Sequence, residues 1–301
     1  MNTSSPVKTS ATIFLLLAFA LATTACSKEP TEGQTDPGMV SDMNSADLGE
    51  SSMDANMTSP TEDMSVADMQ EDLGEQLPGI ENTAEGNPLV PEHPLLPFPS
   101  DFFLREDSTT RTGKSIQLPE EVVPRFLSTE MFAGIDGFSL IPPIITFLPG
   151  GYDPSSLPDP YSPGATLEDD SPAFLLQGPD WERLPALVER DVNAETDEER
   201  ALIVRPLRAL DPETTYVVVL TNKLKRADGS AHEPNPAFIA LRDGTQTSSA
   251  ELERERERFG LIEEAVGQQN LEMSEVVMAW SFTTRSREGA VDGMLAMQAN
   301  A

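Results

Sequence analysis

Few residues of the chain have the type and spacing that catalysis needs. The chain holds two histidines, His93 and His232, and one cysteine, Cys26. A serine hydrolase needs a serine on a tight elbow and a histidine base, yet no G-x-S-x-G segment occurs in the sequence. The nearest segment, around Ser139, lacks the second glycine. We therefore expect no catalytic residue in this chain.

The contexts of the two histidines and of the acidic runs do not favour a base or a metal centre. His93 lies between two prolines, and His232 follows the Asp228-Gly229 turn, where we expect a solvated loop. Glu168-Asp169-Asp170 is the best calcium candidate, although acidic loops are usually only solvated. No cysteine pair, H-E-x-x-H, EF-hand spacing or glycine-rich phosphate loop occurs. The sequence predicts no metal ion and no cofactor.

Cys26 is the residue with the clearest chemistry. It follows Lys8 and an apolar run from Ala11 to Ala22, which suits a signal peptide and is shorter than the roughly 20 residues that span a bilayer. The run ends in Leu21-Ala22-Thr23-Thr24-Ala25-Cys26, which resembles a bacterial lipobox. This resemblance implies removal of residues 1–25, lipidation of Cys26 with palmitate-type acyl chains, and anchoring in the bacterial cell envelope, most naturally the outer membrane. A secreted protein with an incidental cysteine is the alternative.

Charge separates a tether from a folded part. The formal charge of the 301 residues is −31, and residues 27–86 hold 15 acidic residues against one basic residue and no aromatic residue. Such a segment buries too little apolar surface to fold, so residues 26–86 are predicted to be a disordered, lipid-anchored tether. Its Asp-Met units could be read as a copper-binding tract. The carboxylates beside the methionines are hard ligands that suit copper poorly, so we interpret the units as low-complexity sequence. The acidic balance on both sides of residue 87 excludes a nucleic-acid partner.

The folded part begins at Asn87. Residues 87–170 are rich in proline and are predicted to be extended, with few helices. Residues 171–285 contain the strand candidates, which share β-branched and aromatic apolar runs. They are Ala173–Leu176, Ala201–Val204, Thr214–Thr221 and Val276–Thr283.

One helix is predicted between these strands, from about Ser249 to Val266. Ser248 and Glu251 have capping-box spacing, and Gly267 is a plausible stop. Residues 286–301 resemble the start of another helix or a linker, and we expect that a longer protein has been truncated within this segment.

The predicted fold is mostly β: an immunoglobulin-like antiparallel sandwich with one inserted helix. Because the chain has one cysteine, no intramolecular disulfide supports it. Strand position predicts Tyr216, Val218, Trp280 and Phe282 as structural core residues.

Six segments occur in an order that resembles one protein family. They are Pro97–Phe103 (PFPSDFF), Asp136–Ile144, Val204–Leu207 (VRPL), Leu210–Tyr216 (LDPETTY), Leu241–Gly244 (LRDG) and Ala279–Thr284 (AWSFTT). They resemble the N-terminal, immunoglobulin-like region of bacterial virulence-factor-type extracellular lipases and of related large surface lipoproteins. In that family the hydrolase is implied to be a separate domain after this region, so no catalytic residue carries over to this chain.

The resemblance implies a non-catalytic, surface-displayed module with a hydrolase domain as its partner in cis beyond Ala301. A stand-alone binding or adhesion lipoprotein is the second hypothesis, and an ester hydrolase that uses Ser139 is the third. The sequence does not predict a ligand or an oligomeric state.

Overall fold

The computed structural model describes residues 86–120, 123, 128–162, 164–291 and 298. The predicted signal peptide, Cys26 and all of the predicted tether before Gly86 lie outside these residues. Within the described residues, no helix is long and apolar enough to cross a membrane.

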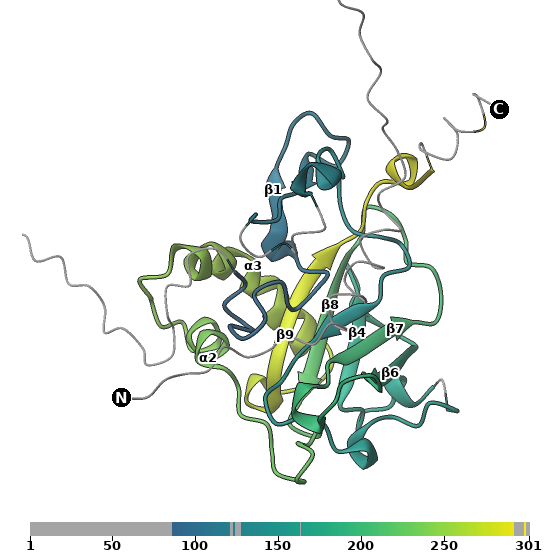
Figure 1. The fold of residues 1–301 in the computed structure, drawn as a ribbon, viewed down its shortest axis with the longest axis vertical. Helices are drawn as coiled ribbons and strands as arrows, with labels where there is room; N and C mark the ends of the chain where they lie inside the picture. The colour runs from purple at the N-terminus through teal and green to yellow at the C-terminus, as the bar shows by residue number, and fades with distance from the viewer. Residues whose placement is uncertain (1–85, 121–122, 124–127, 163, 292–297, 299–301) are drawn as a thin grey trace, which may run out of the picture. The chain divides into compact units, whose positions relative to one another are not determined.

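Strands are the most numerous regular elements in the described part (Figure 1). They are β1 (Leu104–Glu106), β2 (Lys114–Ile116), β3 (Ile144–Thr146), β4 (Ala173–Gln177), β5 (Glu182–Leu184), β6 (Ala186–Arg190), β7 (Leu202–Pro206), β8 (Thr215–Thr221) and β9 (Val276–Thr283). The four predicted strands correspond to β4, β7, β8 and β9, so their positions are confirmed.

The largest sheet has four antiparallel strands in the order β5-β4-β8-β9. β8 lies in its interior, where Val218 is opposite Leu175 on β4 and Trp280 on β9. This position explains its apolar run. A strand that pairs on both edges and is covered on both faces of the sheet has no side that faces solvent. All of Tyr216–Thr221 is buried.

A second antiparallel sheet has the order β3-β7-β6. Its strand β3 comes from the proline-rich part and pairs with β7, so residues on both sides of position 170 share one sheet. The two sheets contribute to one hydrophobic cluster, and the Thr146 hydroxyl of β3 lies 3.5 Å from the Met278 sulfur of β9. The described chain is therefore mostly β, with antiparallel sheets and few helices, consistent with a β-sandwich.

Two helices, α2 (Pro236–Arg242) and α3 (Ala250–Gly267), lie beside the large sheet, on the other side from β6 and β7 (Figure 1). α3 contacts β8 and β9, and Phe238 of α2 meets Phe259 of α3 with ring centroids 5.8 Å apart. Because helices cover one face and the second sheet the other, every residue from Val276 to Phe282 is buried.

The ends of α3 differ from the prediction. Ser249, one residue later than expected, caps the helix and accepts a hydrogen bond from the Leu252 amide over 3.3 Å, so Ser248 and Glu251 form no capping box. The helix includes Gly267, and the left-handed residue after it is Asn270, with φ 57°. α2 was not predicted because its seven residues are too few to show a clear periodicity.

The proline-rich part contains short strands and single 3-10 turns, as expected for extended chain with few helices. The described 3-10 turns are η1 (Asp101–Phe103), η2 (Thr129–Phe132), η3 (Pro154–Ser156), η4 (Ala165–Leu167), η5 (Asp197–Glu199) and η6 (Met273–Glu275). After β9, residues 287–291 are helical, as predicted for the last segment.

Candidate functional site

Asp101 is the most unusual ionisable group in the described part of the chain. It opens η1, which Ser100 caps: the N–H of Phe102, the second residue of the turn, donates to the Ser100 hydroxyl over 3.3 Å. The Asp101 carboxylate is buried and accepts hydrogen bonds from the hydroxyls of Ser281 and Thr283 on β9, each over 3.0 Å. Its other oxygen has no hydrogen-bond partner among the described residues.

Burial sets the electrostatics of this carboxyl. Loss of water raises the pKa of Asp101, and the hydrogen bond from Ser281 and the charge of Arg258 oppose this only in part. Burial also raises the pKa of Glu255 on α3, although Arg258 and Arg254 lie beside it. The Arg258 guanidinium is 2.5 Å from the Glu255 carboxylate.

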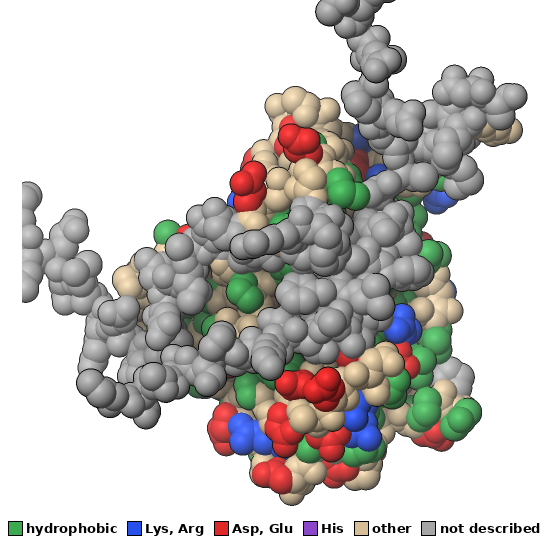
Figure 2. All heavy atoms as spheres, in the orientation of Figure 1, with side chains coloured by type: hydrophobic (Ala, Val, Ile, Leu, Met, Phe, Trp, Pro, Cys, Tyr) green, Lys and Arg blue, Asp and Glu red, His purple; other side chains and the backbone are tan. Residues whose placement is uncertain are grey.

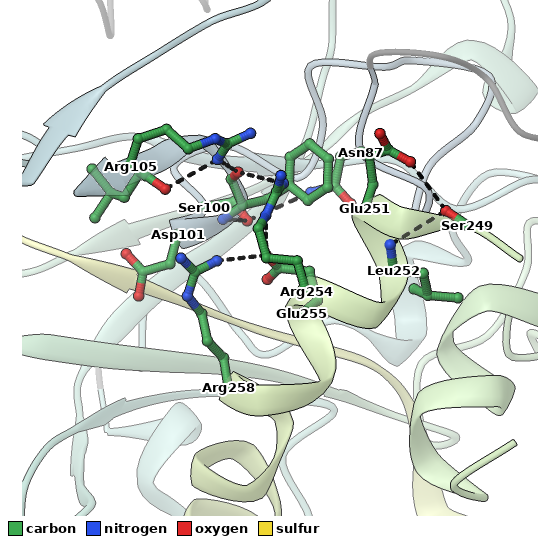
Figure 3. A network of polar contacts seen from close by, with 12 residues as sticks. Asn87, Ser100, Asp101, Arg105, Ser249, Glu251, Leu252, Arg254, Glu255 and Arg258 are labelled. Carbon is green, nitrogen blue, oxygen red and sulfur yellow. Dashed lines mark hydrogen bonds and ion pairs between the residues drawn. The ribbon is translucent and has the colours of Figure 1, made fainter. Parts of the chain in front are cut away.

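Arginines complete a network between η1 and α3 (Figure 3). Arg105 donates to the Phe102 carbonyl over 2.5 Å, and Arg254 stacks on the Phe102 ring 5.0 Å from its centroid. Burial and the neighbouring charges of Arg254 and Arg258 lower the pKa of Arg105. Positive and negative groups therefore largely compensate one another within this network.

The space beside the network is too small for an organic substrate. A cavity of about 20 Å³ lies between Ser100, Glu255, Arg258, Trp280 and Ser281, which is room for about one water molecule. A carboxyl with a raised pKa is a common general acid, but here a substrate could not reach it without displacing the core. We conclude that the network joins α3, η1 and β9.

Most of the segments that carry the family resemblance meet near this network. Trp280 donates its indole N–H to the Pro99 carbonyl over 2.9 Å. The Phe138 amide donates to the Thr283 carbonyl over 3.0 Å, and the Thr284 hydroxyl donates to the Asp211 carbonyl over 2.6 Å. These contacts link four segments that are distant in sequence, so their residue types serve the packing around β9.

Gly137 is a motif residue whose backbone conformation is also explained by packing against β9. Its φ is +151°, and a Cβ placed on it would lie 2.7 Å from the Arg285 nitrogen. Only glycine allows the 136–139 segment to approach the end of β9 this closely. The glycine of the nearest approximation to a nucleophile elbow is therefore required for packing.

Both histidines are buried, which corrects the expectation of a solvated loop at His232. His93 packs edge-on against Phe147 with ring centroids 4.5 Å apart, and His232 lies 5.6 Å from the ring of Tyr152. Burial lowers the pKa of each imidazole to about 4. Such weak bases are poorly matched to proton transfer near neutral pH.

The remaining predicted site residues are separate from one another. The Ser139 hydroxyl accepts a hydrogen bond from the Ile141 amide over 3.2 Å, and in the described part of the chain no hydrogen bond joins Ser139 to a histidine. Asp169 of the calcium candidate pairs with Arg183 over 2.9 Å. Among the described residues no group of three or more histidine, cysteine or acidic side chains could hold a metal ion.

The four predicted core residues lie in the large sheet. Val218 is fully buried on β8 and is opposite Trp280 on β9, which is 2% exposed. Tyr216 and Phe282 are also buried, and their rings stack with centroids 5.4 Å apart. The Tyr216 hydroxyl accepts a hydrogen bond from the Asp211 amide over 2.8 Å.

Sequence reasoning missed Asp101 and Glu255 as perturbed groups. The sequence signal for Asp101 was its place among the phenylalanines from Phe98 to Phe103. An aspartate that is buried with such neighbours needs a hydrogen-bond or charge partner, or else it destabilises the fold. Glu255 lies in the alternating glutamate and arginine run of residues 251–258, a pattern that gives no sign of burial. A scan against protein-family models finds no match to this chain, and a search of curated proteins finds no relative.

Proposed function

We propose that this protein is a lipid-anchored surface protein whose folded part is a non-catalytic, immunoglobulin-like module. We further propose that it is the N-terminal accessory region of a lipase-like lipoprotein. The observation that supports this most directly is the convergence of the motif segments around β9. Their polar groups bond one another, as Asp101 does with Ser281 and Thr283.

The proposed role is to fold, space and present a hydrolase domain. A module with this role needs a stable core and a tether, and it needs no reactive groups of its own. The predicted lipobox at Cys26 and the acidic segment up to Gly86 supply the anchor and the reach in this proposal.

Metabolic labelling tests the anchor. Cells that express the chain are grown with radiolabelled palmitate, and the wild type is expected to be labelled while Cys26→Ser is not. Ser27→Ala is the matched control, because it changes the neighbouring residue and leaves the thiol in place. Label on Cys26→Ser, or none on the wild type, would contradict lipidation at Cys26.

The size of the native protein tests the accessory role. An immunoblot of isolated outer membranes, with antibody against residues after Asn87, is expected to show a band at least twice the mass of this chain. A band near the mass of this chain would instead support the stand-alone binding or adhesion lipoprotein.

An esterase assay tests whether the chain is an enzyme. The purified protein is expected not to hydrolyse a short-chain nitrophenyl ester above the rate of a heat-denatured sample. Hydrolysis that is lost in Ser139→Ala and retained in Ser155→Ala, a second surface serine, would show an ester hydrolase and overturn the non-catalytic assignment.

A further inference from the structure

The chain leaves the end of β9 through a short, closely bonded turn. The Arg285 amide donates to the Phe138 carbonyl over 2.8 Å, and the Arg285 carbonyl accepts from the Glu213 amide over 3.2 Å. Residues 287–291 then form a helix, drawn in yellow after β9 in Figure 1. The backbone that follows β9 is therefore bonded to two other segments before this helix begins.

Asp136 holds the start of the helix. It is 5% exposed, and its carboxylate accepts a hydrogen bond from the Ser286 amide over 3.3 Å. Ser286 is 1% exposed and caps the helix, because its hydroxyl accepts from the Gly289 amide over 3.0 Å and its carbonyl accepts from the Ala290 amide over 3.1 Å. The first helical turn is thus bonded both to its own cap and to the folded part.

Gly289 shows how closely the helix packs on Asp136. A Cβ placed on Gly289 would lie 2.8 Å from an Asp136 carboxylate oxygen and 2.9 Å from the Ser286 hydroxyl. Both distances are shorter than van der Waals contact, so an alanine there has to push the carboxylate or the hydroxyl aside. The Arg285 guanidinium also donates to the Gly289 carbonyl, which adds a bond between the turn and the helix.

An exposed ion pair adds less to this contact. The side chains of Arg111 and Glu288 approach to 3.2 Å and are 59% and 47% exposed. Surface charges of opposite sign are also neighbours elsewhere on the molecule: acidic and basic side chains lie next to one another at the lower end of the face drawn in Figure 2. Water and salt screen such pairs, so the buried bonds of Asp136 and Ser286 make the larger contribution.

We propose that Asp136, Ser286 and Gly289 form a rigid joint that fixes the orientation of the helix after β9 on the folded part. Asp136 is the positioning residue of this joint. A domain attached beyond the helix would be carried as an extension of β9 and would not swing on a linker. That consequence rests on the proposed hydrolase domain, whereas the joint itself does not.

Amide hydrogen exchange of the purified full chain tests the joint. The amides of Ser286, Gly289 and Ala290 are expected to exchange more slowly than in a short peptide of the same sequence. Asp136→Ala should make their exchange about tenfold faster, because their anchor on the folded part is lost. Asp136→Asn keeps an oxygen that can accept from the Ser286 amide and should stay within about threefold of the wild type. Wild-type exchange as fast as in the peptide would overturn the joint.

Gly289→Ala gives a second test, in which packing and helix propensity have opposite effects. Alanine normally stabilises a helix relative to glycine. Here its Cβ would displace the Asp136 carboxylate, so the Ser286 amide should exchange about fivefold faster. Slower exchange in this variant would contradict the close packing on which the joint depends, and the test stands even if Asp136→Ala does not fold.

The matched control is Gly260→Ala on α3. A Cβ on Gly260 would meet no described atom within 4 Å outside the backbone of its own helix. This variant should therefore leave exchange at Ser286, Gly289 and Ala290 unchanged. Equal acceleration by Gly260→Ala and Gly289→Ala would reduce the effect to a general loss of stability and overturn the joint.

Distances between spin labels test the orientation itself. In full chains that carry Cys26→Ser, one label is placed at Val291→Cys and the other at Glu257→Cys, an exposed position on α3. The distance distribution should be as narrow as that of a reference pair at Glu182→Cys and Glu257→Cys, and Asp136→Ala should broaden it. Equally broad distributions with and without the Asp136 carboxylate would overturn the rigid joint. A narrow distribution together with a native band near the mass of this chain would support the joint and remove the hydrolase domain.

Discussion

At the scale of single residues, four ionisable groups make stability depend on pH because they are largely removed from water. The pKa values of Asp101 and Glu255 are raised by burial, whereas the pKa values of His93 and His232 are lowered by burial. In each case burial favours the uncharged form. The carboxyls and the histidines therefore change the free energy of unfolding in opposite directions as the solution is acidified.

Asp101→Asn should flatten the pH dependence of stability. A carboxyl whose folded-state pKa is raised above 3.8 stabilises the fold below pH 3.8, and this contribution is lost as the pH rises through the folded-state pKa. Asparagine has no ionisation to lose, and its amide oxygen can still accept from Ser281 and Thr283. In urea unfolding, the variant should lose less stability than the wild type between about pH 4 and about pH 7.

Asp101→Ala is the companion variant, because it removes the acceptor of both β9 hydroxyls. It should lose about 1–3 kcal/mol of stability, since the buried Ser281 hydroxyl then lacks its acceptor, whereas the Thr283 hydroxyl keeps its contact with the Thr215 hydroxyl. Identical pH profiles for the wild type and Asp101→Asn would mean that Asp101 keeps an ordinary pKa in the folded state.

His93→Phe should protect the fold against acid. The pKa of His93 is lowered from 6.5 to about 4, so its contribution is present above pH 6.5 and is lost as the pH falls toward about 4. This loss is on the order of 3 kcal/mol, and phenylalanine can keep the edge-on contact with Phe147. Thermal unfolding should therefore show a smaller fall in melting temperature between pH 6.5 and pH 4 for the variant than for the wild type. An unchanged decline would contradict the assignment.

At the scale of elements, the sequence was most informative where an apolar run was uninterrupted and least informative at ends. Thr215–Thr221 forms β8 as predicted, because its β-branched residues favour only an interior strand. The cap of α3 was wrong by one residue, because Ser248 and Ser249 are both good caps and only the fold chooses between them. Glu255 is largely buried near η1, in a contact between distant segments that no local pattern encodes.

Ser249→Ala should destabilise the protein by about 1 kcal/mol, because the Leu252 amide loses its acceptor at the start of α3. Ser248→Ala is the control on the neighbouring exposed residue and should change stability by less than about 0.5 kcal/mol. Urea unfolding of both variants at neutral pH gives the comparison. A larger loss in Ser248→Ala would restore the capping box first expected from the sequence.

At the scale of the whole folded part, the sequence predicted the β-rich class but not how closely the proline-rich part joins the strands. Residues 87–170 have few apolar runs of their own, so their contribution to the core was not evident. In the structure, Phe98 exchanges two main-chain hydrogen bonds with Ile145, and Pro99 accepts from Trp280. Such contacts join residues up to 181 positions apart, and no local periodicity indicates them.

A fragment of residues 171–285 should therefore fail to fold alone, although it contains six of the strands. It lacks β3, which pairs with β7, and it lacks the phenylalanines of η1 and the partner of Trp280. The Trp280 indole would then face water, and a strand edge would be open to association. The fragment should bind a hydrophobic dye, show weak near-ultraviolet circular dichroism and unfold without a cooperative transition. Residues 86–301 are the control and should unfold cooperatively, with buried tryptophan fluorescence. If the shorter fragment also unfolded cooperatively, residues 87–170 would be a peripheral layer and the β-rich core would be complete without them.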